Sequence, residues 1–265
     1  MNLVLFCDYG LDDAVATVDA LMHAKADGYD RVDLVAIGGN VPADVALINA
    51  KKLVANLDFA LPKILIVDTT AYSQPCEYLK DIHGGDGMGD LFKEKTCPVP
   101  AISFDNWLGE LKEGEFALLS LGPMTLVPYA LEKKPCKFAF MGGNIAEVPN
   151  FQGYEFNHAI NRTAFSECVK YPHVAITMDT CRHPLINIQN KEIMGEDILH
   201  RLVRRNREMT FHSGEKGCYV WDDIAVKYLR HPDWFALYEA KDKDGNLLTV
   251  AKYVHGVEFL KIIEE

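Results

Sequence analysis

The 265-residue sequence lacks the features of several classes of protein. No apolar run approaches the roughly 20 residues of a membrane-spanning helix, and no linker, repeat or low-complexity stretch divides the chain. We therefore expect a single domain over residues 1–265. Basic residues are scarce, because 27 lysines and arginines stand against 38 aspartates and glutamates, for a formal net charge of −11. Since nucleic acids and anionic membranes both select basic surfaces, this balance argues against either as a partner.

Paired cysteines and phosphate-binding motifs are also missing. The seven cysteines are odd in number and form no C-x-x-C pair, which argues against a disulfide framework or a zinc site and favours a reducing cytoplasm. No GxxxxGKS/T loop occurs, and the glycines of residues 85–89 lack the strand and spacing of a dinucleotide fingerprint. A haloacid-dehalogenase-type DxDxT loop is excluded, because Phe6 and Gly10 occupy its first and last positions.

Short apolar segments alternate along the chain with longer amphipathic ones. This order favours a doubly wound α/β fold with a mostly parallel sheet, in which ligands bind beyond the carboxyl ends of the strands. A hairpin is predicted near the end of the chain, with its turn at Asp244–Gly245. The predicted helices are Leu11–Ala26, Ala43–Leu57 and Lys191–His212, and the predicted strands are Leu3–Phe6, Val32–Ile37, Ile64–Val67, Phe116–Leu121, Phe138–Met141 and Val174–Met178.

An acidic loop follows the first predicted strand. Asp8 ends that strand, while Asp12 and Asp13 open the next helix after a tight turn at Gly10. Carboxylates so close together repel one another, and a cation is the usual remedy. Oxygen ligands favour Ca²⁺ or Mg²⁺, and a flexible multi-carboxylate site favours Ca²⁺. The alternative is that the Asp pair only stabilises the positive end of the helix dipole, but Asp8 at the strand exit favours the metal site.

This loop, Phe6–Asp13, resembles the DxDxGxDD signature of the inosine–uridine nucleoside hydrolase family. The resemblance continues along most of the chain, because counterparts of the family motifs G-N-V, L-G-P-L-T, M-G-G and E-F-N and of a late Asp follow in the same order. They are found at residues 38–41, 121–125, 141–143, 155–157 and 221–222. The resemblance implies a Rossmann-like fold and hydrolysis of the N-glycosidic bond of ribonucleosides.

The resemblance also implies roles for individual residues. Asp8 would act as general base toward a calcium-bound water, and members of the family are commonly dimers or tetramers, so we expect a homo-oligomer. The implied calcium ligands are Asp8, Asp13, Asp222 and the backbone carbonyl of Thr125. The implied ribose ligands are Asp12, Asn40, Glu155, Asn157 and Asn150.

The chemistry of the reaction agrees with this set of residues. Cleavage of an N-glycosidic bond passes through an oxocarbenium-like sugar, whose positive charge is stabilised by nearby carboxylates. A bound cation lowers the pKa of its water, and an adjacent aspartate can complete the deprotonation. The same cation can orient the two ribose hydroxyls and so lower the entropic cost of reaching the transition state.

The sequence departs from the family pattern at two informative positions. Phe6 replaces the first Asp of the signature, which leaves the expected metal ligands intact. Trp221 stands where many members have a His that serves as candidate acid for the leaving base. Indole cannot donate a proton as an acid, but its face can stack on a base, as in the purine-preferring branch. His83, in a segment like the family's mobile H-G-x-x-G loop, is a second candidate base-binding residue.

Three functions remain open from the sequence. The first is hydrolysis of a purine-like ribonucleoside to free base and ribose. The second is hydrolysis of a modified 7-deazapurine nucleoside such as queuosine, since a base without N7 needs no acid at that atom. The third is non-catalytic binding of a ribonucleoside, against which the retained metal ligands argue. A phosphohydrolase would need basic residues at the site, and Arg182 is the only one near a predicted strand exit.

Overall fold

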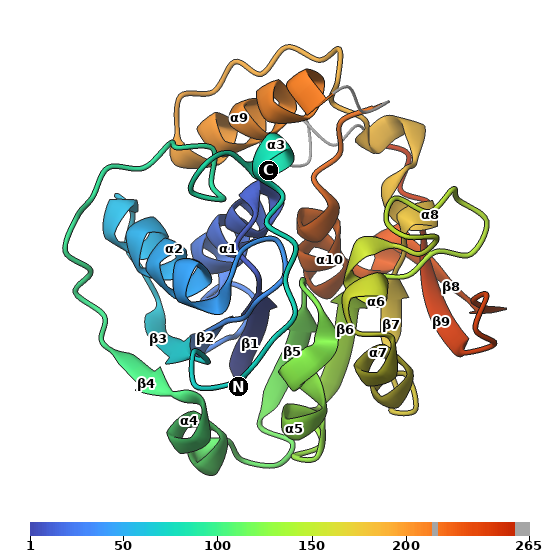
Figure 1. Cartoon of the computed structure of the whole chain (residues 1–265), viewed down its shortest axis with the longest axis horizontal. Coiled ribbons are helices and arrows are strands. Elements are labelled where there is room, and N and C mark those ends of the chain that lie inside the picture. Colours follow the sequence, from blue (N-terminus) through green and yellow to red (C-terminus); the bar gives the residue numbers. More distant parts are fainter. Residues whose placement is uncertain (214–216, 258–265) are drawn as a thin grey trace.

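The structure, a computed structural model, describes residues 1–213 and 217–257. In this part of the chain, a nine-stranded sheet forms the centre of the protein (Figure 1). The strand order is β4-β3-β2-β1-β5-β6-β7-β9-β8, and every neighbouring pair is parallel except β8 and β9. The strands are β1 Asn2–Cys7, β2 Arg31–Ala36, β3 Lys63–Asp68, β4 Ala101–Ser103, β5 Phe116–Ser120, β6 Lys137–Met141, β7 Val174–Ile176, β8 Phe235–Lys241 and β9 Leu247–Tyr253. This mostly parallel α/β sheet confirms the predicted fold class.

Helices cover both faces of the sheet. The longer ones are α1 Leu11–His23, α2 Ala43–Asn56, α9 Ile198–Ser213 and α10 Trp221–Arg230. The shorter ones are α3 Lys80–His83, α4 Phe104–Glu110, α5 Val127–Leu131, α6 Phe156–Ile160, α7 Arg162–Cys168 and α8 Met178–Cys181, with single 3₁₀ turns η1 Met124–Leu126, η2 Pro184–Ile186 and η3 Pro232–Trp234. Among the described residues, no helix is both long and apolar enough to span a membrane.

Three boundaries predicted from the sequence are wrong by two or more residues. The first helix, predicted to reach Ala26, ends at His23. The predicted helix from Lys191 begins instead at Ile198, because Asp197 caps its first turn by accepting the backbone N–H of His200 at 3.1 Å. The carboxylate satisfies a donor that the helix itself cannot, so the helix starts there rather than earlier. The predicted strand ending at Met178 stops at Ile176, since Met178 opens α8.

The two faces of β1 belong to different cores. Leu3, Leu5 and Cys7 pack into the layer that contains α1, α2, α9 and α10, whereas Val4 and Phe6 pack into the layer that contains α4, α5 and α7. Side chains alternate between the faces of a strand, so a strand buried on both sides is apolar throughout. The Phe6 ring lies 6.0 Å from the ring of Trp107, on the face of the sheet away from α1.

Candidate functional site

Hydrogen bonds from backbone N–H groups to the Asp13 carboxylate hold the acidic loop together. Asp13 accepts the backbone N–H of Asp8 at 3.1 Å and that of Gly10 at 2.8 Å, one on each carboxylate oxygen. Between them Tyr9 adopts a left-handed backbone conformation with φ of 48°, which is uncommon for a residue other than glycine. These bonds turn the chain sharply from β1 into α1 and bring Asp8, Asp12 and Asp13 to the carboxyl edge of the sheet.

Asp8 lies between two backbone segments that approach its carboxylate so closely that only glycine fits at the nearest position of each. Its carboxylate accepts the backbone N–H of Asn40 at 2.6 Å and the Asn40 side-chain amide at 3.2 Å. A β-carbon on Gly39 would overlap the Asp8 oxygen Oδ2, and one on Gly122 would lie 2.8 Å from Asp8 Cγ. The strand exits after β2 and β5 therefore fix Asp8 from two sides.

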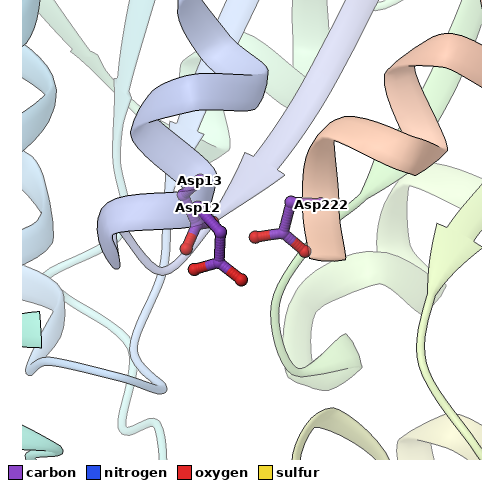
Figure 2. A group of neighbouring side chains, drawn as sticks. All are labelled: Asp12, Asp13 and Asp222. Carbon is purple, nitrogen blue, oxygen red and sulfur yellow. The ribbon is translucent and has the colours of Figure 1, made fainter. Parts of the chain in front are cut away.

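Three carboxylates converge where two helices begin. Oxygen atoms of Asp12, Asp13 and Asp222 all lie within 4.8 Å of one another, and Figure 2 shows them pointing together from the first turns of α1 and α10. All three side chains are buried. The positive ends of two helix dipoles meet at this point, which stabilises anionic groups there. Asp12, which the family resemblance implies as a ribose ligand, is therefore also a member of the carboxylate cluster.

Burial dominates the electrostatics of the cluster. Loss of solvent raises the pKa of Asp8 to about 7 and that of Asp12 to about 6, and it raises the pKa of Asp13 and Asp222 well above the ordinary range. The neighbouring carboxylates raise the pKa of Asp13 and Asp222 further. Buried acidic groups with these pKa values lack a compensating positive charge.

A pocket opens above this cluster at the carboxyl ends of the strands. It brings together eight residues predicted from the sequence, namely Asp12, Asn40, His83, Asn150, Glu155, Asn157, Trp221 and Asp222. Asp8, Asp13 and Thr125 do not line it. Thr125 lies in η1, where its hydroxyl accepts the side-chain amide of Asn161 at 3.1 Å.

Hydrogen bonds hold the side chains of Glu155 and Asn157 in place at the N-terminus of α6. Glu155 caps this helix and accepts the backbone N–H groups of Gly143, Asn157 and His158 at 2.8, 2.8 and 3.0 Å. Burial nevertheless raises the pKa of Glu155 to about 7. The Asn157 amide donates to the carbonyls of Leu121 and Met141 at 2.7 and 3.2 Å, and so joins the ends of β5 and β6.

His83 has a fixed tautomer. Its Nδ1 accepts the backbone N–H of Leu11 at 3.1 Å, at the N-terminus of α1, so in the neutral ring the proton resides on Nε2. Burial lowers the pKa of His83 to about 4. The ring is therefore neutral near pH 7 and can offer a hydrogen-bond donor, Nε2–H, in the wall of the pocket.

One wall of the pocket is aromatic. Trp221 lies 5.4 Å from the ring of Tyr219, and the Arg182 guanidinium lies 5.5 Å from the Trp221 ring centroid. Asn206 of α9 donates its side-chain amide to the Tyr219 carbonyl at 3.1 Å.

Three polar residues of the pocket lining were not predicted from the sequence. They are Asn206, Thr210 and Tyr219. The signal was present for two of them, because Asn206 and Thr210 lie four positions apart and hence on one face of a helix.

Comparisons with known proteins identify the family of this chain. The sequence profile of the family described as inosine-uridine preferring nucleoside hydrolase matches residues 3–258. The pyrimidine-specific ribonucleoside hydrolase RihB of Escherichia coli is 23% identical over 261 residues, which cover 88% of this chain and 79% of that protein.

Two solved structures share the fold. The purine-preferring ribonucleoside hydrolase from Gardnerella vaginalis superposes with a TM-score of 0.72 at 19% identity, over 100% of this chain and 96% of that one. The inosine-uridine preferring nucleoside hydrolase from Bacillus anthracis has a TM-score of 0.64 at 14% identity, over 96% and 94% of the two chains. The chain therefore belongs to the inosine-uridine preferring nucleoside hydrolase family, which confirms both the resemblance of its motifs and the enzyme class that they predict.

Proposed function

We propose that this protein hydrolyses the N-glycosidic bond of a purine-like ribonucleoside, releasing the base and ribose. The observation that carries the proposal is one pocket that is lined both by Asp12 and Asp222 of the buried carboxylate cluster and by Trp221. The carboxylates suit the sugar and its developing positive charge, and the indole suits a flat base.

The donor set fits a divalent cation. The Asp12 oxygen Oδ1 is buried and has no hydrogen-bond partner among the described residues, and burial raises the pKa of all the neighbouring aspartates. Such a set of oxygens favours Ca²⁺. We propose Asp8, Asp13, Asp222 and the Thr125 carbonyl as ligands, with Asp12 beside them. When bound, the cation supplies a positive centre that orients the ribose diol and makes water more acidic.

The protein's own residues carry the other steps. Asp8 takes the proton of the attacking water, the role that the family resemblance implies for it, and the Asn40 amides and two glycines hold its carboxylate in place. Asp12, Asn40, Asn150, Glu155 and Asn157 bind the ribose hydroxyls, and the buried carboxylates among them stabilise the positive sugar. Trp221 stacks on the base, and the His83 Nε2–H offers it or the sugar a hydrogen bond.

Asp8→Asn tests the assignment of the base. General-base catalysis typically contributes a factor of about 10² to 10⁴, so ribose release from purine ribonucleosides should fall by about that much. Asp58→Asn, at an exposed position beyond the end of α2, is the matched control and should keep full activity. Turnover of Asp8→Asn within tenfold of wild type would remove Asp8 as the base.

A 7-deazapurine nucleoside such as queuosine is the second candidate substrate. One observation favours it: the only imidazole lining the pocket in the described part of the chain is His83, whose pKa of about 4 makes its ring a poor acid near pH 7. A base that lacks N7 loses less from the absence of an acid. A ribose-release screen of adenosine, guanosine, inosine and queuosine at equal concentration decides between the two.

The same screen addresses the non-catalytic alternative. Tight calorimetric binding of a ribonucleoside without ribose release would indicate a binding protein rather than a hydrolase.

We further infer that the protein is a homo-oligomer, either a dimer or a tetramer, and that it acts in the cytoplasm. Light scattering of the purified protein tests the first inference, and cell fractionation tests the second.

A further inference from the structure

A polar cluster lies outside the pocket, where the β8–β9 turn meets the segment of residues 150–162. Asp244, in that turn, accepts three hydrogen bonds from the Arg162 guanidinium: Nη2 donates to Oδ1 at 2.9 Å and to Oδ2 at 2.8 Å, and Nε donates to Oδ2 at 3.1 Å. The Asp244 oxygen Oδ1 also accepts the hydroxyl of Tyr154 at 2.9 Å. One carboxylate therefore joins the hairpin turn to α7 and to the chain just before α6.

Tyr154 is held by cations as well as by this carboxylate. The Arg162 guanidinium carbon lies 4.3 Å from the centroid of its ring, and the Lys243 ammonium lies 3.2 Å from it. Lys243 also donates to the Gly153 carbonyl. Cation–π contacts of this kind add to the hydrogen bond and restrict the ring to one orientation.

The segment held in this way contains a tight turn in an unfavourable conformation. Phe151 and Tyr154 exchange backbone hydrogen bonds of 2.9 and 2.8 Å, with Gln152 at φ 44° and Gly153 at φ 82° between them. A left-handed glutamine persists only where the surrounding structure fixes it. Because Asn150 precedes the turn and Glu155 follows it, the geometry of the turn sets the spacing of two pocket residues.

His158 is a second point at which the polar cluster contacts a segment that lines the pocket. This side chain is 1% exposed, stacks on Phe165 with ring centroids 3.9 Å apart, and places its Nε2 3.5 Å from an Asp244 oxygen. His158 directly follows Asn157, the residue that bridges the ends of β5 and β6. Asp244 therefore contacts the segment on both sides of its pocket residues.

We propose that Asp244 is a positioning residue: by its hydrogen bonds to Tyr154 and Arg162 and its contact with His158, it fixes the segment that presents Asn150, Glu155 and Asn157 to the substrate. Asp244 itself is not a pocket-lining residue, so it acts through these neighbours. The catalytic consequence rests on the proposed function, whereas the ordering of residues 150–158 does not.

The first arm of the test measures activity. In Asp244→Asn, kcat/KM for a ribonucleoside should fall roughly 10- to 100-fold, mainly in kcat, because small displacements of positioned groups have costs of this order. The same fall is expected with a nitrophenyl riboside, since the defect concerns the sugar rather than the base. Asp244→Glu, which retains the charge, should recover part of the loss.

The control for this arm is Glu113→Gln, which removes an exposed ion pair with Lys134 (3.1 Å) near the amino end of β5. It should stay within twofold of wild type. If Asp244→Asn does not fold, Arg162→Gln removes the partner of the same contact at a half-exposed position and should give the same loss. Activity of either folded variant within twofold of wild type would overturn the proposal.

The second arm needs no substrate. Hydrogen exchange of the Phe151 and Tyr154 amides should become at least tenfold faster in Asp244→Asn, while exchange in α2 stays unchanged. If these two amides keep their protection, Asp244 does not order the segment, whether or not the protein hydrolyses nucleosides. If the wild type releases no ribose but exchange accelerates as expected, the proposed function fails and the positioning role stands.

Discussion

At the scale of single residues, the proposed base is fixed largely by the main chain around it. Asp8 lies against two strand exits that approach it more closely than any side chain would allow, at Gly39 and Gly122. The backbone N–H of Asn40 then orients one oxygen of the carboxylate. The position of Asp8 therefore depends on glycine at neighbours that carry no chemistry themselves.

Gly39→Ala should displace Asp8 and lower ribose release by at least about 100-fold, since a misplaced catalytic group can lose that much. The physical reason is the overlap between the new β-carbon and the Asp8 carboxylate. Steady-state kinetics of ribose release measure it. Gly109→Ala in α4 is the matched control, because no atom lies within 4 Å of its added β-carbon, and it should keep full activity.

Trp221→Ala should separate base recognition from sugar chemistry. Stacking of a base on an aromatic ring is worth about 1–3 kcal/mol, so KM for purine ribonucleosides should rise about 5- to 150-fold. With a nitrophenyl riboside, which has no purine to stack, KM should change far less. Equal rises with both substrates would indicate that the indole supports the pocket structurally instead.

Strand exits in the sequence predicted the segments that contain Asp12 and Asn40, whereas Glu155, Asn157 and Asp222 were predicted only from the family resemblance. The structure gathers all five at one pocket. Tyr219 escaped prediction because it lies in an irregular segment before α10. Its place in the wall depends on long-range contacts, such as its carbonyl with Asn206, that no local pattern records.

At the scale of helices, α1 and α10 are joined beneath the pocket by a buried ionic network. Asp19 of α1 lies 3.1 Å from the Lys227 ammonium and 3.1 Å from the Arg230 guanidinium, both of α10. Burial raises the pKa of Asp19, but the hydrogen bond from His23 and the charges of Lys227 and Arg230 outweigh it and lower the pKa to about 2. The network fixes the two helices that carry the carboxylate cluster.

Asp19→Asn should lower the free energy of unfolding by about 3 kcal/mol, because it leaves buried cations without their partner. A folded-state pKa below the unfolded value of about 3.9 means that the contribution is present above about pH 4 and is lost as pH falls through about 2. Urea unfolding from pH 2 to 7 measures both effects. A constant difference between the variants across that range would contradict the argument.

Exposed Asp233→Asn in η3 serves as the control and should unfold like the wild type.

The ionic network between α1 and α10 could not be predicted from the sequence. Asp19 and Lys227 lie far apart in the chain, and only the packing of α1 on α10 brings them together. The start of α9 was likewise misplaced, since a run of polar residues resembles a helical surface until the cap at Asp197 is seen.

At the scale of the whole molecule, the sheet gathers every proposed ligand at one edge. The central strands β2, β1, β5 and β6 are parallel neighbours, so their carboxyl ends open on the same side. Alternation of strands and helices was sufficient to predict this arrangement, because it follows from local apolar patterns. The strand β4 was not predicted, because its Ala101 and Ser103 are exposed and it therefore has no apolar run, unlike the equally short but more buried β7.

Calcium should stabilise the whole fold. A ligand that binds only the native state at 100 times its Kd adds about 2.7 kcal/mol, so millimolar Ca²⁺ should raise Tm by several degrees and EDTA should reverse the rise. Differential scanning fluorimetry with and without Ca²⁺ measures this. Asp222→Asn should abolish the shift, and a wild type insensitive to both additions would rule out the calcium site.

The pairing of α1 with α10 also has a consequence for the order in which the protein is made. Asp12 and Asp13 leave the ribosome early, whereas Asp222 follows only after seven strands of the sheet have been synthesised. Domains generally fold as units during or after synthesis. A nascent chain therefore carries two of the three clustered carboxylates for most of its synthesis, and the cluster is completed only when α10 docks against α1. A product shortened before α10 would keep the acidic loop yet lack the hydrolase site.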